Sequence, residues 1–180
     1  MIQYNKIIFT GPVGAGKTTA ITSLSDVPPV KTDQVASDMT KSRKASTTVA
    51  LDYGMMTLPG GEKIHLYGTP GQERFDFMWD ILTTGGIGLV LLLDNTRADP
   101  FQDLRFFLNK FGSFIEATSL VIGVTQMDVR ATPLVSDYHR QLEASGLNPP
   151  IFEVDARRKK DVSLLVQALL YSIDPGLEDQ

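Results

Sequence analysis

A glycine-rich segment followed by lysine and threonine is the part of this chain best suited to chemistry. Residues 11–18 read Gly-Pro-Val-Gly-Ala-Gly-Lys-Thr, the G-x-x-x-x-G-K-[ST] spacing of a phosphate-binding loop. In such a loop, glycines let successive backbone N–H groups point into one concavity that binds phosphate oxygens. Lys17 would reach the β- and γ-phosphates of a nucleotide, and the Thr18 hydroxyl would bind Mg²⁺. The predicted phosphate site comprises Gly11, Gly14, Ala15, Gly16, Lys17, Thr18 and Thr19.

The sequence on both sides of this loop supports the motif. Residues 4–10 are a β-type run before the loop, and residues 17–25 are a plausible helix after it. A phosphate-binding loop needs this order of strand, turn and helix, because the helix N-terminus adds a partial positive charge. The alternative is a glycine turn that occurs by chance, and the flanking segments argue against it.

Strand-like and helix-like segments alternate along the chain. The turn at residues 59–61 makes the second and third predicted strands an antiparallel hairpin. The alternation predicts an α/β fold with a six-stranded, mostly parallel sheet, one antiparallel edge strand, and helices on both faces. Residues 1–175 are predicted to form one domain and residues 176–180 a frayed tail. Strands are predicted at 4–10, 48–58, 62–68, 87–93, 120–124 and 151–154, and helices at 17–25, within 71–84, and at 100–111, 134–145 and 161–173.

Composition excludes several classes of function. The 180 residues carry a net charge of −4, so no basic surplus points to nucleic acid or to an anionic membrane. The absence of cysteine excludes disulfides, cysteine catalysis and lipid attachment through cysteine. The longest apolar run, residues 87–93, is far too short to span a bilayer. We therefore expect a cytoplasmic protein with no direct membrane anchor.

With these elements in place, the chain resembles the small Ras-like GTPases over residues 1–175. The resemblance implies a Ras-like G domain of the P-loop NTPase class, which hydrolyses GTP to GDP and phosphate with Mg²⁺. Residues 48–53 look like the switch I segment of Rab-like members. This likeness makes Thr48 the residue that senses Mg²⁺ and the γ-phosphate, with Thr47 as the adjacent candidate.

Residues 69–75, Thr-Pro-Gly-Gln-Glu-Arg-Phe, resemble switch II. By this resemblance, Gly71 gives a backbone N–H to the γ-phosphate and Gln72 orients the attacking water. Phosphoryl transfer requires such positioning because the protein mainly aligns groups and neutralises charge. The alternative for Gln72 is an exposed polar loop residue.

One departure from the family concerns Mg²⁺. The family has an aspartate three residues before Gly71, and Gly68 stands there instead. Asp52, on the neighbouring hairpin strand, is one candidate to supply the missing carboxylate, and an ordinary solvated strand residue is the alternative. In this respect the chain resembles the bacterial gliding-motility GTPases (MglA-like), which also lack that aspartate. Resemblance to that branch implies a bacterial protein with a roadblock-domain activator or effector.

A second departure concerns the base. The family's Asn-Lys-x-Asp motif becomes residues 125–128, Thr-Gln-Met-Asp. The Asp128 carboxylate can accept two hydrogen bonds from guanine N1 and N2, a pair of donors that adenine lacks. The aliphatic part of Gln126 could lie against the base, but this side chain carries no charge. Thr125 has a shorter side chain than the asparagine of the family motif. The family's last motif appears as residues 155–157, where the Ala156 N–H would meet guanine O6 beside Arg157. GTP is favoured over ATP.

Three other features leave alternatives open. Arg43, in the basic loop with Lys41 and Lys44, is the best candidate for an internal arginine finger, and a solvated basic loop is the alternative. The aromatic residues Phe75, Phe77 and Trp79 form either core packing or a partner-binding patch. His65 and His139 are expected to be ordinary surface or sheet residues.

The leading hypothesis is a switch that hydrolyses GTP slowly without an activator and binds a protein partner through switch I and switch II. A nucleotide-binding scaffold with negligible hydrolysis is the second hypothesis. A small P-loop kinase is a third hypothesis, but this sequence has no arginine-rich lid of the kind that such an enzyme needs.

Overall fold

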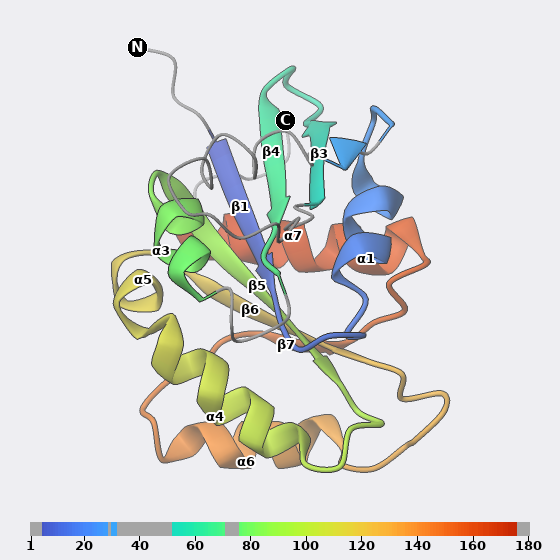
Figure 1. Cartoon of the computed structure of the whole chain (residues 1–180), viewed down its shortest axis with the longest axis vertical. Coiled ribbons are helices and arrows are strands. Elements are labelled where there is room, and N and C mark those ends of the chain that lie inside the picture. Colours follow the sequence, from blue (N-terminus) through green and yellow to red (C-terminus); the bar gives the residue numbers. More distant parts are fainter. Residues whose placement is uncertain (1–4, 29, 32–51, 71–75, 176–180) are drawn as a thin grey trace, which may run out of the picture.

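The computed structural model describes residues 5–28, 30–31, 52–70 and 76–175. A central sheet carries strands in the order β2-β3-β4-β1-β5-β6-β7 (Figure 1). β3 runs antiparallel to its neighbours β2 and β4, and the other neighbouring pairs are parallel. The strands span Asn5–Thr10 (β1), Val30–Lys31 (β2), Asp52–Thr57 (β3), Lys63–Gly68 (β4), Gly86–Asp94 (β5), Leu120–Thr125 (β6) and Ile151–Glu153 (β7).

The predicted α/β class is confirmed, with a mostly parallel sheet and all six predicted strands. The sheet has one strand that the sequence did not predict, β2, which pairs with the outer side of β3. Two residues are too few to produce an alternating pattern, so sequence alone gives no signal for this strand. β3, predicted as the antiparallel edge strand, therefore has β2 as its outer neighbour.

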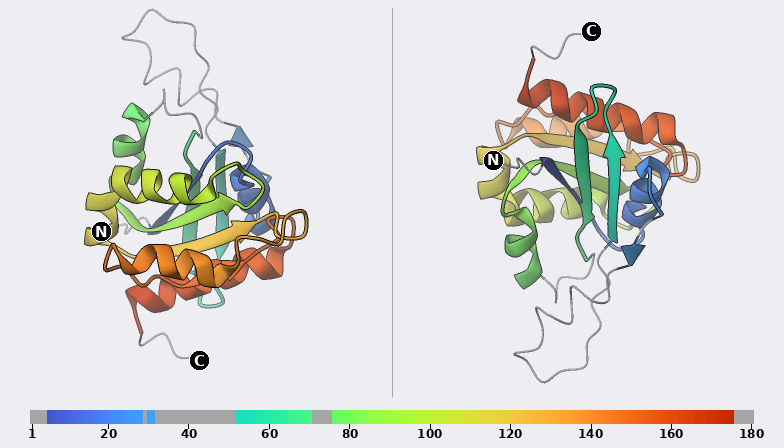
Figure 2. Two further views of the ribbon diagram at one scale, coloured as in Figure 1. Left: turned by 90° about the horizontal axis from the view of Figure 1, so that it is seen from below. Right: turned by 90° about the horizontal axis from the view of Figure 1, so that it is seen from above.

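Helices cover both faces of the sheet, as predicted (Figure 2). α1 and α7 pack on one face, and α3, α4, α5 and α6 pack on the other. Within the parts of the chain that the structure describes, no helix combines the length and apolarity needed to cross a membrane. The helices span Lys17–Leu24 (α1), Phe77–Thr83 (α3), Pro100–Lys110 (α4), Gly112–Ala117 (α5), Val135–Glu143 (α6) and Lys159–Ile173 (α7). Of the helices that the structure describes, α5 alone was not predicted, since its six residues are too few for a helical period.

β5 is buried on both faces, as its continuous apolar sequence predicted. Leu89, Leu91 and Leu93 join the core under α4, whereas Val90 and Leu92 join the core under α1 and α7. Because β1, β5 and β6 are parallel neighbours, the loops after their carboxyl ends meet at one edge of the sheet. This edge brings the glycine-rich loop together with residues 95 and 126–128.

Candidate nucleotide site

The loop between β1 and α1 depends on backbone conformations that glycine adopts far more readily than other residues. Gly11 has a φ of 146° and Gly16 a φ of 100°. A Cβ at Gly11 would lie 2.0 Å from the carbonyl oxygen of Leu92, so only glycine fits there. A Cβ at Gly16 would lie 3.0 Å from the Cβ of Ala156, which shows how closely the loop after β7 approaches the glycine-rich loop.

The glycine-rich loop ends at the N-terminus of α1. Gly16 is the N-cap, and α1 begins at Lys17. Because glycine has no side chain to cap the helix, the first-turn N–H groups stay available to an external acceptor. Thr18 and Thr19 are exposed in this first turn, whereas Ala15 is buried. The helix start therefore has the features of an anion site.

The Lys17 side chain folds back over the glycine-rich loop and is only 8% exposed. Its Nζ donates to the carbonyl oxygens of Gly11 at 2.7 Å and Pro12 at 2.8 Å. Burial lowers the pKa of the ammonium from 10.5 to about 8, the nearby Asp52 carboxylate opposes this shift, and the Arg97 guanidinium adds to it. Lys17 is thus a cation held at the loop on which phosphate oxygens would lie.

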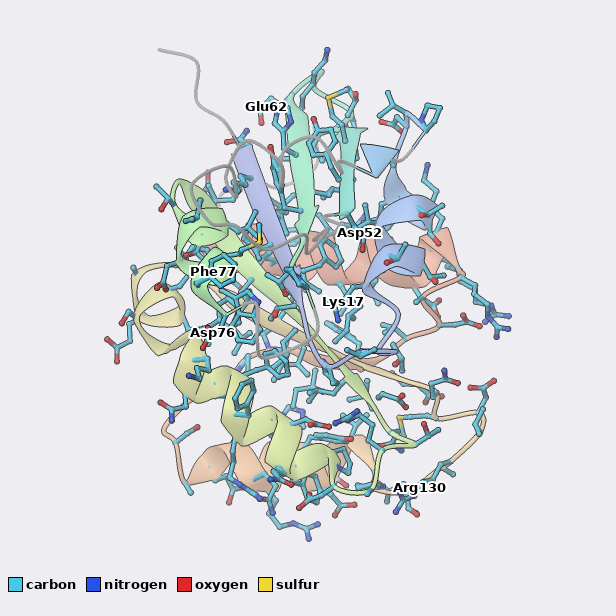
Figure 3. The ribbon with its side chains drawn as sticks, in the orientation of Figure 1. Lys17, Asp52, Glu62, Asp76, Phe77 and Arg130 are labelled. Carbon is cyan, nitrogen blue, oxygen red and sulfur yellow. The ribbon has the colours of Figure 1, made fainter. Side chains whose placement is uncertain are left out.

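Asp52 lies next to Thr18, in the space that Gly68 leaves open. The Thr18 hydroxyl donates to Oδ2 of Asp52 at 2.5 Å. Asp52 is directly opposite Gly68 in the β3–β4 ladder, and a Cβ at Gly68 would lie 3.1 Å from the Asp52 Cβ and 3.4 Å from Oδ2. Figure 3 shows Asp52 and Lys17 beside α1, with Glu62 at the far end of the hairpin. Of the two readings of Asp52, the geometry favours a role at the site.

This pair is suited to Mg²⁺. A hydroxyl that donates a hydrogen bond to a carboxylate keeps lone pairs that can bind a cation. Among the described residues, no cluster of three or more His, Cys, Asp or Glu side chains could hold a metal ion by itself. Mg²⁺ in nucleotide sites usually has few protein ligands and takes the others from phosphates and water, so Thr18 with Asp52 fits such a cation.

A cavity of about 290 Å³ joins the glycine-rich loop to the loop after β6. The Thr125 hydroxyl donates to the carbonyl oxygen of Ala15 at 2.9 Å, so this side chain reaches the glycine-rich loop although it is shorter than asparagine. Gln126 has a φ of 64°, which turns the chain sharply at the start of the loop. Gly14, Gly16, Thr19, Gln126, Asp128, Ala156 and Arg157 are among the residues that line the cavity.

Two residues that were not among the predicted site residues support the base side of this cavity. Asp155 accepts two hydrogen bonds from the Arg157 guanidinium, at 2.9 and 2.8 Å, and hydrogen bonds from that side chain lower the pKa of Asp155 to about 2. The buried Asn95 donates to the carbonyl oxygens of Arg130 and Pro133, and Tyr138 donates to Asn95. Asn95 thereby fixes the far end of the loop that carries Asp128.

Several predicted site residues lie outside the described residues. They are the proposed switch residues Thr47, Thr48, Gly71 and Gln72 and the arginine-finger candidate Arg43. Of the aromatic residues, Phe75 also lies outside, Trp79 is buried in the core at 3% exposure, and Phe77 is 46% exposed. His65 lies in β4, where its Nδ1 shares a hydrogen bond of 2.7 Å with the Tyr53 hydroxyl.

Comparison with known proteins supports a nucleotide-binding fold. Residues 28–169 match the protein family described as "Conserved hypothetical ATP binding protein". "Uncharacterized protein MJ1339" of Methanocaldococcus jannaschii is 30% identical over 121 residues, which are 64% of this chain and 71% of that protein. "Ras-related protein RabC" of Dictyostelium discoideum is 23% identical over 180 residues, 97% of this chain and 86% of that protein.

A solved structure supports the fold alone. The bacterial selenocysteine-specific elongation factor EF-Sec aligns with 96% of this chain at a TM-score of 0.64 and 21% identity. This chain spans 30% of that elongation factor, so the likeness concerns one part of a much longer protein.

Proposed function

Because the chain belongs to the family described as conserved hypothetical ATP binding proteins, we propose that it binds a purine nucleoside triphosphate and hydrolyses it as a Ras-like switch. The observation that carries this proposal is the cavity of about 290 Å³, whose lining combines the phosphate loop with Gln126 and Asp128. A single ligand with phosphates at one end and a purine at the other fits this lining. The likeness to a Ras-related protein over nearly the whole chain supports the same ligand class.

We propose GTP rather than ATP as the nucleotide. Asp128 is an exposed carboxylate at the rim of the cavity, and its acceptor oxygens match the N1–H and N2–H donors of guanine. Thr125 and Asn95 hold the two ends of the loop that carries Asp128. The family description names ATP, so the choice of base needs its own test.

At the phosphate end, Lys17 supplies positive charge and the first turn of α1 supplies N–H donors. Thr18 and Asp52 would hold Mg²⁺, which neutralises charge on the phosphate oxygens when bound. Lys17 would leave the Gly11 and Pro12 carbonyls for phosphate oxygens of greater charge. The remaining roles follow from the resemblance: Thr48 at Mg²⁺, Gly71 N–H at the γ-phosphate, Gln72 on the water and Arg43 as a finger.

We further propose that the triphosphate state signals to a protein partner through switch I and switch II. Phe77 and Ile81, four residues apart on α3, are 46% and 47% exposed and give this region an apolar surface. The MglA-like branch, its bacterial origin and a roadblock-domain partner remain predictions from the sequence resemblance.

The test has two parts. The nucleotide that co-purifies with the protein identifies the base, and single-turnover cleavage of that triphosphate, with and without a partner, measures hydrolysis. GTP with slow cleavage is the expected result. Tight nucleotide binding without any cleavage would favour the scaffold, and co-purified ATP would overturn the choice of guanine.

A further inference from the structure

The residue proposed to select guanine, Asp128, lies inside a tight turn. The N–H groups of Val129 and Arg130 both donate to the carbonyl oxygen of Gln126, at 3.1 and 3.0 Å, which closes the turn. The carbonyl oxygen of Arg130 accepts a hydrogen bond of 2.7 Å from Nδ2 of the buried Asn95. Asn95 therefore fixes one end of the turn that presents Asp128 to the cavity.

A tyrosine from α6 determines which way the Asn95 amide points. The Tyr138 hydroxyl donates to Oδ1 of Asn95 at 2.6 Å. On the other side of the amide, Nδ2 donates to the carbonyl oxygens of Arg130 and Pro133. An amide turned the other way would direct its oxygen at two carbonyl oxygens, which are also acceptors. With Tyr138 as donor, each polar group of this buried side chain has a partner in one orientation.

Tyr138 is well placed to hold this orientation. Its side chain is fully buried, and its ring packs edge-on against Phe101 at the start of α4, with centroids 5.1 Å apart. Burial raises the pKa of Tyr138, so the phenol keeps its proton near pH 7 and remains a donor. At the surface, the Arg130 guanidinium donates to the carbonyl oxygen of Arg97 at 3.0 Å, which ties the same turn to the loop after β5 a second time. Figure 3 shows Arg130 well away from Lys17.

We propose that Tyr138 is a positioning residue for base selection: its hydroxyl orients the Asn95 amide, which holds the turn so that Asp128 meets N1–H and N2–H of guanine. Lys17 and the first turn of α1 bind the phosphates without this tie. Loss of the hydroxyl should therefore weaken discrimination between bases without slowing cleavage of bound triphosphate. This inference rests on the proposed function, because it takes Asp128 as the acceptor for guanine.

The test compares GDP with IDP, whose base keeps N1–H but lacks the N2 amino group. The ratio of the two dissociation constants measures the contact of Asp128 with N2, and single-turnover cleavage of bound GTP measures the phosphate side. Tyr138→Phe removes one oxygen atom and should lower the ratio about three- to tenfold, the range for one hydrogen bond, with cleavage unchanged. Arg130→Ala removes the second tie at the surface, outside the core, and should lower the ratio in the same direction.

Leu142→Val is the matched control. Leu142 is buried on the same helix, but its side chain has no hydrogen-bonding group. This variant should lower the melting temperature and leave the ratio unchanged. In an Asp128→Asn background, Tyr138→Phe should cause no further loss of discrimination, because it acts through Asp128.

Three results would overturn the inference while leaving the proposed function intact. They are an unchanged ratio in folded Tyr138→Phe, an equal fall of the ratio in Leu142→Val, and full additivity of Tyr138→Phe with Asp128→Asn. If Tyr138→Phe does not fold, an unchanged ratio in Arg130→Ala overturns it. If the unsubstituted protein binds GDP and IDP equally, the proposed contact of Asp128 with guanine fails before any substitution is made, and the inference falls with it.

Discussion

Removing the Asp52 carboxylate should weaken Mg²⁺-dependent nucleotide binding. Asp52 accepts the Thr18 hydroxyl proton at 2.5 Å and so orients the oxygen proposed to bind Mg²⁺. Loss of such a supporting group typically lowers metal affinity by about 10- to 100-fold. Asp52→Asn keeps the size and removes the charge, and Glu62→Gln is the matched control, since Glu62 is a hairpin acid far from the site (Figure 3).

The structure also predicts that the carboxylate can be moved from β3 to β4. Gly68→Asp alone should be destabilising, because its Cβ would lie 3.1 Å from both the Asp52 Cβ and the Ile21 Cδ1, and two like charges would then adjoin. Overpacking of this kind costs about 1–3 kcal/mol, or roughly 2–12 °C in melting temperature for a domain of this size. Asp52→Gly removes the contact from one side, so the exchanged protein should regain stability and Mg²⁺ dependence together.

The assay is the release rate of a fluorescent GDP analogue at increasing free Mg²⁺. We expect the half-point in Mg²⁺ to rise about 10- to 100-fold in Asp52→Gly and to return to within about fivefold of the original in the exchanged protein. Full return would be a recovery of about 1.4–2.7 kcal/mol between these adjacent sites, and return to within fivefold would be a recovery of about 0.4–1.8 kcal/mol. An unchanged half-point in folded Asp52→Asn or Asp52→Gly, or a folded exchanged protein that stays as weak as Asp52→Gly, would refute the reasoning.

Other perturbations test the rest of the site. Lys17→Ala should abolish nucleotide binding, because the β- and γ-phosphates lose their close cation, and near-native affinity by fluorescence titration would contradict the phosphate-loop assignment. Asp128→Asn should weaken the binding of GTP and GDP by about 1.5–3 kcal/mol for each charged hydrogen bond lost, and it should relax selection against ATP. Equal competition by ATP in the original protein would contradict the choice of guanine. Gln72→Leu should leave nucleotide affinity intact and sharply lower single-turnover cleavage, since its proposed role is only to align water. Burial lowers the pKa of Lys17 to about 8. GDP affinity should therefore be flat near pH 7 and fall above pH 8, by at most about tenfold per pH unit, as the ammonium loses its proton. Calorimetry in two buffers of different ionisation enthalpy should then detect proton uptake on binding.

The lowered pKa of Lys17 has the opposite effect on the folding stability of the protein without nucleotide: affinity falls with pH, whereas stability rises. The folded state binds the Lys17 proton less tightly than the unfolded chain, whose lysine keeps a value near 10.5. Between about pH 8 and 10.5 the unfolded state therefore holds more protons, and this residue's contribution to stability rises with pH. A decline of nucleotide affinity over that range cannot come from loss of fold through Lys17.

The strand, glycine-rich loop and helix that form the proposed phosphate site could be predicted from sequence because their determinants are local. Gly11 and Gly16 need their conformations whatever the rest of the chain does, and Lys17 and Thr18 follow at fixed spacing. The base side was less predictable. Thr125 contacts Ala15 across 110 positions of sequence, and only the packing of β6 beside the loop shows that its short side chain reaches. Asn95 carries no motif, so its hold on the Arg130 and Pro133 carbonyls was missed.

Trp79 shows a different limit. Its spacing allowed either core packing or an exposed patch, because α3 has only seven residues and its neighbours alternate between the two. The structure divides the cluster, with Trp79 in the core and Phe77 at the surface. The hydrogen bond from its indole N–H to the Pro70 carbonyl oxygen had no sequence signal, since a buried indole needs an acceptor but the sequence does not name one.

Gly68 and Asp52 argue together against decay of the site. Residues directly opposite in an antiparallel ladder project to the same face, so a carboxylate on β3 can occupy the space that a side chain on β4 would otherwise fill. A glycine at the β4 position favours this exchange, because a Cβ there would lie 3.1 Å from the Asp52 Cβ, a tighter contact than most side chains make. Gly68 has no positive φ, so backbone conformation does not demand glycine there, and the space for Asp52 and Ile21 is the remaining physical reason for it. A chain that had lost the site would have no reason to pair that glycine with a carboxylate bonded to Thr18, and this pairing is what favours a working Mg²⁺ site over an inert scaffold.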